Sequence, residues 1–134
     1  MIRSARPLLL VAALLALSAC ARGQAPSGGP VQPGELASVL AGADAPLLLD
    51  VRTPDEFAQG HVPGATLVPV QELEARLAEL DAYKTRGVVT YCEVGGRASK
   101  AAELLRAHGF ANVRQLDGSM KRWREEAREV ATGS

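Results

Sequence analysis

The residues most able to do chemistry lie in one short stretch, residues 88–99, with the sequence VVTYCEVGGRAS. It begins as an apolar, β-branched run typical of a strand and leads into an Ala- and Leu-rich segment typical of a helix. Cys92 lies between the two. Backbone N–H groups and the positive end of a helix dipole stabilise a thiolate at such a place. We therefore predict a reactive cysteine, the alternative being an ordinary buried cysteine that ends a strand.

The residues after Cys92 favour the reactive interpretation. Gly95 and Gly96 allow a loop to close around the sulfur without Cβ clashes, and Arg97 brings a positive charge. A helix follows directly, so its free N–H groups face the loop. Together these features predict a loop built around an anionic sulfur.

The N-terminus predicts export. Arg3 and Arg6 precede an apolar run, Leu8 to Ala19, that is too short to span a bilayer and ends in small residues. This is the pattern of a secretory signal, the alternative being a buried N-terminal helix. We therefore expect residues 1–19 to be a signal peptide, residues 20–33 a flexible Pro- and Gly-rich tether, and residues 34–134 the folded domain.

The four residues Leu17-Ser18-Ala19-Cys20 resemble the bacterial lipobox, in which the cysteine is diacylated and becomes the first mature residue. The resemblance implies a lipid anchor at Cys20 on the periplasmic side of the cell envelope. Ala21 after it, rather than Asp, suggests the outer membrane. The lipid anchor is the only membrane attachment that we expect.

Composition restricts the partners. The chain has 134 residues, enough for one domain, with 15 basic and 15 acidic residues. Removing residues 1–19 leaves 13 basic and 15 acidic residues, so nothing indicates nucleic-acid binding. A basic cluster near the C-terminus alternates with glutamates, which is typical of a solvated helix face; its members are Lys121, Arg122, Arg124 and Arg128.

The cysteine count makes Cys92 unusual for an exported protein. The chain has two cysteines, and if Cys20 carries a lipid, Cys92 has no intramolecular partner in an oxidising compartment. An unpaired exported thiol needs a reductant or a sulfur donor. A periplasmic thiol or persulfide protein is therefore a candidate partner.

Strand and helix patterns alternate along the chain. Strands are expected at 46–51, 64–70, 87–91 and 112–116, and helices at 34–40, 53–57, 71–80, 98–108 and 119–130. This alternation predicts an α/β layer structure with a mainly parallel sheet. Ligands in such sheets bind at the carboxyl ends of strands, where Cys92 is expected.

Two motifs resemble those of a single-domain rhodanese, a sulfurtransferase. The first is DVRTPDEF at residues 50–57, continuing as GHVPGA at 60–65; the second is Tyr91-Cys92 with Gly95, Arg97 and Ser99. The match runs from about Gly34 to Trp123. It implies a rhodanese-like three-layer fold, with a central sheet of about five strands flanked by helices.

The resemblance also implies a mechanism. Cys92 would attack the outer sulfur of a donor such as thiosulfate, and the resulting persulfide would pass to a thiophilic acceptor such as cyanide or a thiol. The residues expected to hold the persulfide and the donor are Glu93, Val94, Gly95, Gly96 and Arg97. This is two-step nucleophilic catalysis, without metal or cofactor.

Loop length distinguishes two chemistries of this fold. Four residues separate Cys92 from Arg97, whereas cysteine phosphatases need five to surround a tetrahedral phosphate. The shorter loop is similar to the sulfur-transfer form.

Glu93 departs from the family pattern, in which a basic or neutral residue often follows the cysteine. A carboxylate that faces the pocket would repel thiosulfate, whereas one that faces solvent would be screened. The alternative function is therefore a non-catalytic persulfide carrier or a protein-interaction module in the envelope.

Charged residues near the first motif are expected to support the loop. The resemblance implies that Asp50 and Arg52 brace it from behind, and the same role is preferred for Glu56 and His61 over a catalytic triad. Arg97 has two open roles, donor binding or bracing. The two histidines, His61 and His108, have no spacing that indicates a metal site.

Overall fold

A parallel sheet of four strands lies at the centre of the computed structural model, which describes residues 28–134. The predicted signal peptide and Cys20 lie outside the described residues. The strands occur in the order β2-β1-β3-β4; their bounds are β1 Leu47–Asp50, β2 Thr66–Leu67, β3 Val88–Tyr91 and β4 Val113–Gln115. All three strand pairs are parallel, as the sequence predicts.

The two central strands are short apolar runs with no exposed residue. All four residues of β1 and all four of β3 are buried, because helices cover both faces of the sheet. β1 and β3 pair from Leu47 and Val88 to Asp50 and Tyr91. Their carboxyl ends therefore bring the Asp50 and Cys92 segments to the same edge.

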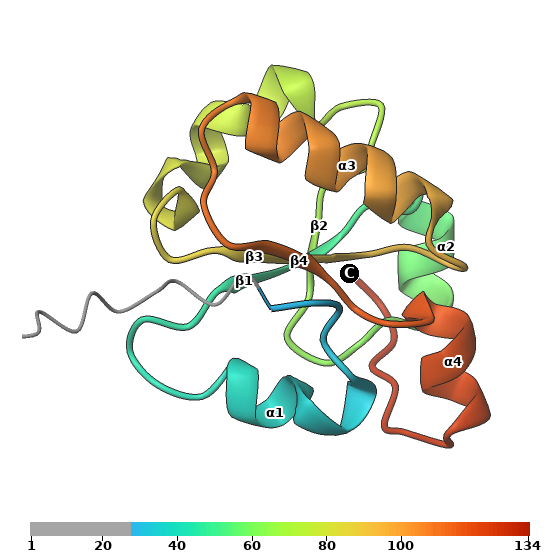
Figure 1. Cartoon of the computed structure of the whole chain (residues 1–134). Helices are drawn as coiled ribbons and strands as arrows, with labels where there is room; N and C mark the ends of the chain where they lie inside the picture. Colours follow the sequence, from blue (N-terminus) through green and yellow to red (C-terminus); the bar gives the residue numbers. More distant parts are fainter. Residues whose placement is uncertain (1–27) are drawn as a thin grey trace, which may run out of the picture.

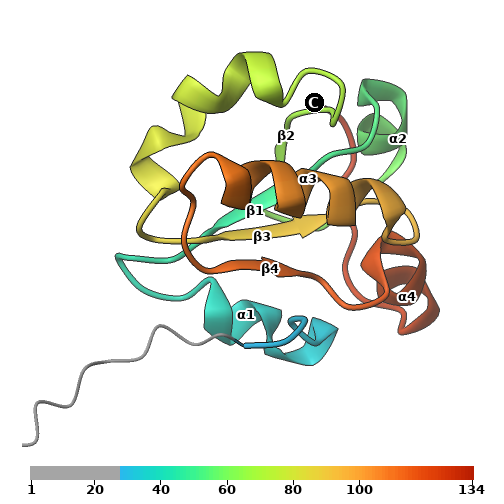
Figure 2. The same cartoon turned by 45° about the horizontal axis from the view of Figure 1, so that its top comes forward.

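The helices form a layer on each face of the sheet (Figures 1 and 2). On one face lie α3 and the 3-10 helix η2, and on the other lie α1 and α4. Their bounds are α3 Gly96–Ala107, η2 Glu74–Tyr83, α1 Leu36–Val39 and α4 Ser119–Glu125. A short 3-10 turn, η1 (Pro33–Glu35), precedes α1, and α2 (Pro54–Gln59) follows β1.

Successive strand residues point to opposite faces of the sheet and pack into two separate hydrophobic cores. One core joins β1 and β3 to α3 and η2; its members include Leu47, Leu49, Val88, Ala101, Leu105 and Leu80. The other joins the same strands to α1 and α4; its members include Leu48, Val89, Tyr91, Leu36, Met120 and Trp123. Each buried leucine contributes about 1.5–3 kcal/mol relative to an exposed one. This double-sided burial holds α3 and α4 against the end of β3.

The helix α2 begins as its sequence predicts. Thr53 caps it by accepting a hydrogen bond from the Glu56 N–H, and the Glu56 carboxylate accepts one from the Thr53 N–H. Pro54 occupies the first helical position, where no N–H is needed. This local chemistry fixes Glu56 at the start of α2, close to the cysteine loop.

The predicted α/β class and parallel sheet are confirmed, and several element bounds differ from the expected ones. About five strands were expected; four are present among residues 28–134, and Val31 adds a single parallel bridge to Leu116. Val31 is fully buried, although it belongs to the stretch assigned to the tether. The packed part of the chain therefore includes Val31.

Two expected helices have different ends. The helix expected to reach Val130 ends at Glu125, because Ala127 adopts a positive φ of 52° and the Trp123 indole N–H donates to the Glu129 carbonyl. The segment expected at 71–80 is a 3-10 helix that continues to Tyr83, which packs against the same core as Leu80. Within residues 28–134, no helix has the length and apolarity needed to cross a membrane.

Candidate active site

Cys92 follows β3 directly, and its sulfur lies within a turn of backbone amides. The Gly95 N–H lies 3.0 Å from Sγ and the Ala98 N–H 3.4 Å from it. Gly95 has a φ of +127°, which strongly favours glycine, and it directly precedes α3. Two donors that converge on one sulfur stabilise negative charge there. Cys92 is also buried, with 1% of its surface exposed.

The opposite side of the loop is attached to α4. The Cys92 N–H donates to the Ser119 hydroxyl at 3.2 Å. In the first turn of α4, the Met120 N–H donates to the Cys92 carbonyl and the Lys121 N–H donates to the Glu93 carbonyl, at 3.0 and 2.9 Å. The free N–H groups at the start of α4 therefore hold two consecutive carbonyls of the loop, those of Cys92 and Glu93.

Asp50 and Arg52 form a fully buried ion pair behind the loop. The Arg52 Nη2 lies 2.8 Å from Asp50 Oδ2, and Nε lies 3.1 Å from Oδ1. Nη2 also donates to the Gly60 carbonyl at 2.7 Å. Burial alone lowers the pKa of Arg52, but the hydrogen bond and charge of Asp50 outweigh it, so the pKa lies above its ordinary value. Arg52 therefore stays charged, which is tolerable in the interior because Asp50 satisfies it.

Tyr91 precedes Cys92 and is also buried. Its hydroxyl accepts a hydrogen bond from the Val62 N–H at 3.1 Å. Burial raises the pKa of the phenol, and the negative charge of Asp50 raises it further. The phenol stays protonated over the working pH range and so does not act as a base.

Arg97 pairs with Glu56 across the loop. The two guanidinium nitrogens Nη1 and Nη2 lie 2.7 and 2.8 Å from the two carboxylate oxygens. The hydrogen bond from Arg97 lowers the pKa of Glu56 to about 2, and the Thr53 cap acts in the same direction. Of the two roles left open for Arg97, bracing is the one visible in this geometry; donor binding stays a prediction.

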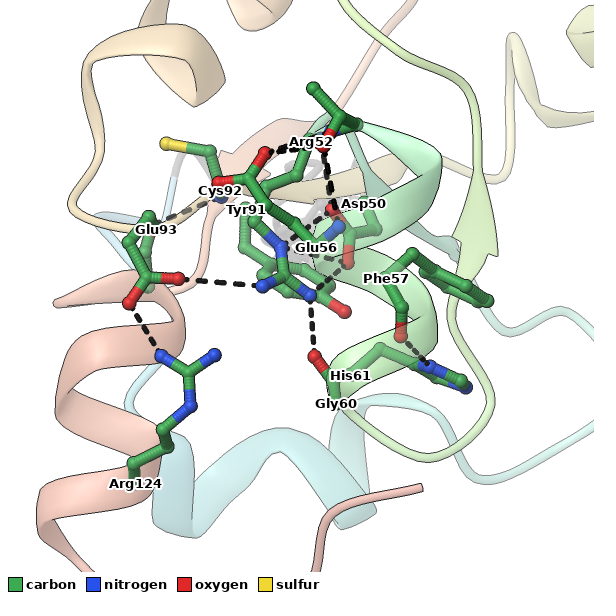
Figure 3. Close-up of polar contacts among 12 residues, drawn as sticks. Asp50, Arg52, Glu56, Phe57, Gly60, His61, Tyr91, Cys92, Glu93 and Arg124 are labelled. Carbon is green, nitrogen blue, oxygen red and sulfur yellow. Dashed lines mark hydrogen bonds and ion pairs between the residues drawn. The ribbon is translucent and has the colours of Figure 1, made fainter. Parts of the chain in front are cut away.

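The Glu93 carboxylate lies between two arginines. Arg52 Nη1 lies 3.4 Å from one oxygen, and Arg124 of α4 donates to the other. Figure 3 shows the Glu93 carboxylate directed toward Arg124 and the Cys92 sulfur pointing elsewhere. The side chain is 34% exposed and faces these arginines rather than the sulfur.

His61 lies away from the sulfur and is occupied elsewhere (Figure 3). Its ring stacks on Phe57 with centroids 3.6 Å apart, and Nδ1 lies 2.8 Å from the Phe57 carbonyl oxygen. This packing fits the supporting role that the sequence favoured over a general base. His108 similarly places Nδ1 2.9 Å from the Leu104 carbonyl at the end of α3.

The tip of the loop opens onto a polar cavity. Val94 is 69% exposed, the most exposed large apolar residue recorded among the described residues. Beside it lies a cavity of about 340 Å³ whose lining includes Ser99, Gln115 and Asp117. Within residues 28–134, no group of three or more Cys, His, Asp or Glu is arranged to hold a metal ion.

Two contacts of this site were not predicted from the sequence. Ser119 supports the Cys92 backbone, and Arg124 pairs with Glu93 although it was assigned to a solvated helix face. Neither residue belongs to the two motifs that carry the family resemblance, and both reach the loop only because α4 packs beside it (Figure 1). No local signal in the sequence marks such a contact.

Comparison with known proteins places this fold and loop in a family. Residues 32–126 match the family model described as "Rhodanese-like domain", and the chain belongs to this family. A protein named "Sulfurtransferase" from Allochromatium vinosum is 38% identical over 88 residues, which cover 66% of this chain and 80% of that one. The human thiosulfate:glutathione sulfurtransferase is 35% identical over 104 residues, covering 69% and 90%.

Solved structures agree on the fold. A rhodanese-like domain protein from Staphylococcus aureus superposes with a TM-score of 0.66 at 27% identity, covering 80% of this chain and 100% of that one. A rhodanese-related protein from Thermoplasma volcanium has a TM-score of 0.68 at 24% identity, covering 79% and 100%, and shows the fold alone. The predicted family resemblance is confirmed, and the named relatives support a sulfurtransferase.

Proposed function

We propose that Cys92 accepts a sulfane sulfur from a small anionic donor such as thiosulfate and passes it to a thiophilic acceptor. The Cys92 thiolate attacks the outer sulfur, the S–S bond of thiosulfate breaks, and sulfite leaves with the bonding electron pair. A persulfide anion remains on Cys92. Attack by cyanide or a thiolate on its outer sulfur releases thiocyanate or a new persulfide and returns the thiolate.

The observation that carries this proposal is the pair of amides that converge on the sulfur. The N–H groups of Gly95 and Ala98 point at Sγ, and they stabilise the thiolate both before it attacks the donor and when it is released as the sulfur passes to the acceptor. The buried Asp50–Arg52 pair and the Arg97–Glu56 pair hold the surrounding backbone, so these amides need not reorganise during the reaction.

The acceptor is assigned to the polar cavity beside the loop. Its lining includes the hydroxyl of Ser99, the amide of Gln115 and the carboxylate of Asp117, whose charge is offset by Arg122. These polar groups suit a small acceptor such as cyanide or a low-molecular-weight thiol. The human relative carries glutathione in its name, which supports a thiol acceptor here.

The setting is part of the same proposal. The signal pattern and the lipobox resemblance at Cys20 support a protein anchored by lipid on the periplasmic side of the envelope, in the outer membrane. In that oxidising compartment, a thiol or persulfide protein would keep Cys92 reduced or deliver its sulfur.

A second candidate is a persulfide carrier that docks on a protein. The observation that favours it is Val94, an apolar side chain 69% exposed at the tip of the catalytic loop. A carrier would form the persulfide readily but turn over slowly with cyanide. The two candidates thus differ in the second half-reaction.

The test is thiosulfate–cyanide turnover by the full-length chain and by two cysteine variants. We expect Cys92→Ser to lose thiocyanate formation entirely, because serine cannot hold the transferred sulfur as a persulfide. Cys20→Ser is the matched control, and its purified activity should equal that of the wild type. Full activity in Cys92→Ser would refute the proposal, whereas persulfide formation without turnover would favour the carrier.

A further inference from the structure

The residue after the nucleophile carries a charge that should hinder the proposed reaction. Glu93 places a carboxylate next to Cys92 in sequence, and the proposed donor, the thiolate and the persulfide are all anions. A free carboxylate at that position would repel the donor and oppose ionisation of the sulfur. The structure nevertheless keeps Glu93 at the loop, with only 34% of its side chain exposed.

Arg124 provides the compensation. It lies on α4, one turn beyond the residues whose amides hold the Cys92–Glu93 backbone, and it donates to Glu93 Oε1. The other oxygen faces Arg52, but Arg52 is already paired twice with Asp50. Arg124 is therefore the charge that balances Glu93, and the four groups Asp50, Arg52, Glu93 and Arg124 together carry no net charge.

We propose that Arg124 is a positioning residue that holds the Glu93 carboxylate away from the Cys92 sulfur and neutralises it, so that an anionic sulfur donor can reach the thiol. The inference rests on the proposed sulfur transfer. It implies that the site selects its donor by negative charge. Arg124 acts through Glu93 and is not assigned a contact with the donor.

Selective alkylation of Cys92 measures the local charge without depending on sulfur transfer. Iodoacetate is an anion and iodoacetamide is neutral, so the ratio of their rate constants reports the electrostatic potential at the thiol. The full-length, reduced chain would be alkylated and digested with trypsin, and the label counted on the peptide of residues 87–97, which excludes Cys20. A purely structural disturbance changes the rates of both reagents in the same direction and leaves their ratio unchanged.

The variants separate Arg124 from other charges of the same helix. We expect Arg124→Gln to lower the iodoacetate-to-iodoacetamide ratio about threefold and Glu93→Gln to raise it about threefold, as for one unit charge roughly 10 Å away through screened protein surface. The double variant should return to within about twofold of wild type. Arg122→Gln is the matched control, because Arg122 lies on α4 but pairs with Asp117 and Glu126 and not with the loop.

The same variants test the preference for anionic sulfur donors. Thiosulfate carries two charges, so Arg124→Gln should lower its kcat/KM about tenfold, the square of the effect on a monoanion. Benzenethiosulfonate, a monoanionic donor of the same sulfur, should lose about threefold. Both losses should shrink in 1 M salt, where the Debye length is about 3 Å.

Two outcomes would overturn the inference. If Arg124→Gln behaves like Arg122→Gln in the alkylation ratio, Arg124 does not set the charge at the sulfur. If the double variant stays as low as Arg124→Gln, Arg124 acts on the anion directly rather than through Glu93. If the ratios follow the prediction but no persulfide forms on wild-type Cys92, Arg124 still offsets the charge of Glu93 at the thiol, whereas the proposed sulfur transfer fails, and the donor preference fails with it.

Discussion

Two arginine–carboxylate pairs flank the cysteine loop, and they differ in depth. Arg52 and Asp50 are completely buried and lie two residues apart in the chain, at the end of β1. Arg97 and Glu56 have about a third of their side chains exposed and are 41 residues apart. Both pairs are bidentate, so geometry alone does not distinguish them.

The difference in depth separates a structural support from an adjustable one. Removing one member of a buried pair leaves a charge that water cannot reach, which is strongly destabilising. Removing one member of a solvent-accessible pair leaves a charge that water can hydrate, which costs little. The Asp50–Arg52 pair therefore maintains the fold behind the loop. The Glu56–Arg97 pair fixes the loop itself, and breaking it should destabilise the fold only a little.

The largest effect is expected from breaking the buried pair. Asp50→Asn should lower the free energy of unfolding by about 3–5 kcal/mol, because Arg52 keeps its charge without its buried carboxylate partner. The measurement is urea denaturation of the full-length chain. Asp117→Asn, which breaks a half-exposed pair with Arg122, is the matched control and should lose less than about 1 kcal/mol. Equal losses in the two variants would contradict the assignment by depth.

A smaller and pH-dependent effect is expected from the accessible pair. The pKa of Glu56 is about 2 in the folded protein and near 4.5 without its partners, so its contribution is complete above pH 4.5 and is lost as pH falls toward 2. Glu56→Gln should therefore be less stable than wild type by about 1 kcal/mol at pH 6, and the gap should close near pH 2.

Glu79→Gln is the matched control for this prediction. Glu79 forms a similar bidentate contact with Arg76, but its side chain is 56% exposed against 33% for Glu56, and it should show a smaller gap at pH 6. A gap for Glu56→Gln that persists unchanged to pH 2 would mean that the charge of Glu56 contributes nothing.

Local patterns in the sequence predicted most of the fold. The apolar runs of β1 and β3 and the Thr53-Pro54 cap of α2 each act within a few residues, so their physical chemistry is visible in sequence order. The position of Cys92 between a strand and a helix followed from the same local evidence. The end of α4 could not be predicted in this way, because it depends on the hydrogen bond from the Trp123 indole to the Glu129 carbonyl, which forms beyond the helix end.

Contacts between distant segments explain the remaining differences. Glu56 reaches Arg97, and Arg124 reaches Glu93, only once the sheet has brought α2, α3 and α4 to one edge. From the sequence alone, Arg97 could bind the donor or brace the loop, and Glu93 could face the pocket or the solvent. The sequence did not distinguish these alternatives. The packing of α4 decides the direction of Glu93.

The most direct test of the central claim is the mass of the Cys92 peptide after the full-length protein meets thiosulfate. The account predicts that the tryptic peptide of residues 87–97 gains one sulfur atom, that the Cys20 peptide does not, and that cyanide removes the added sulfur. An unchanged peptide after treatment with both thiosulfate and a persulfide donor would contradict sulfur transfer through Cys92.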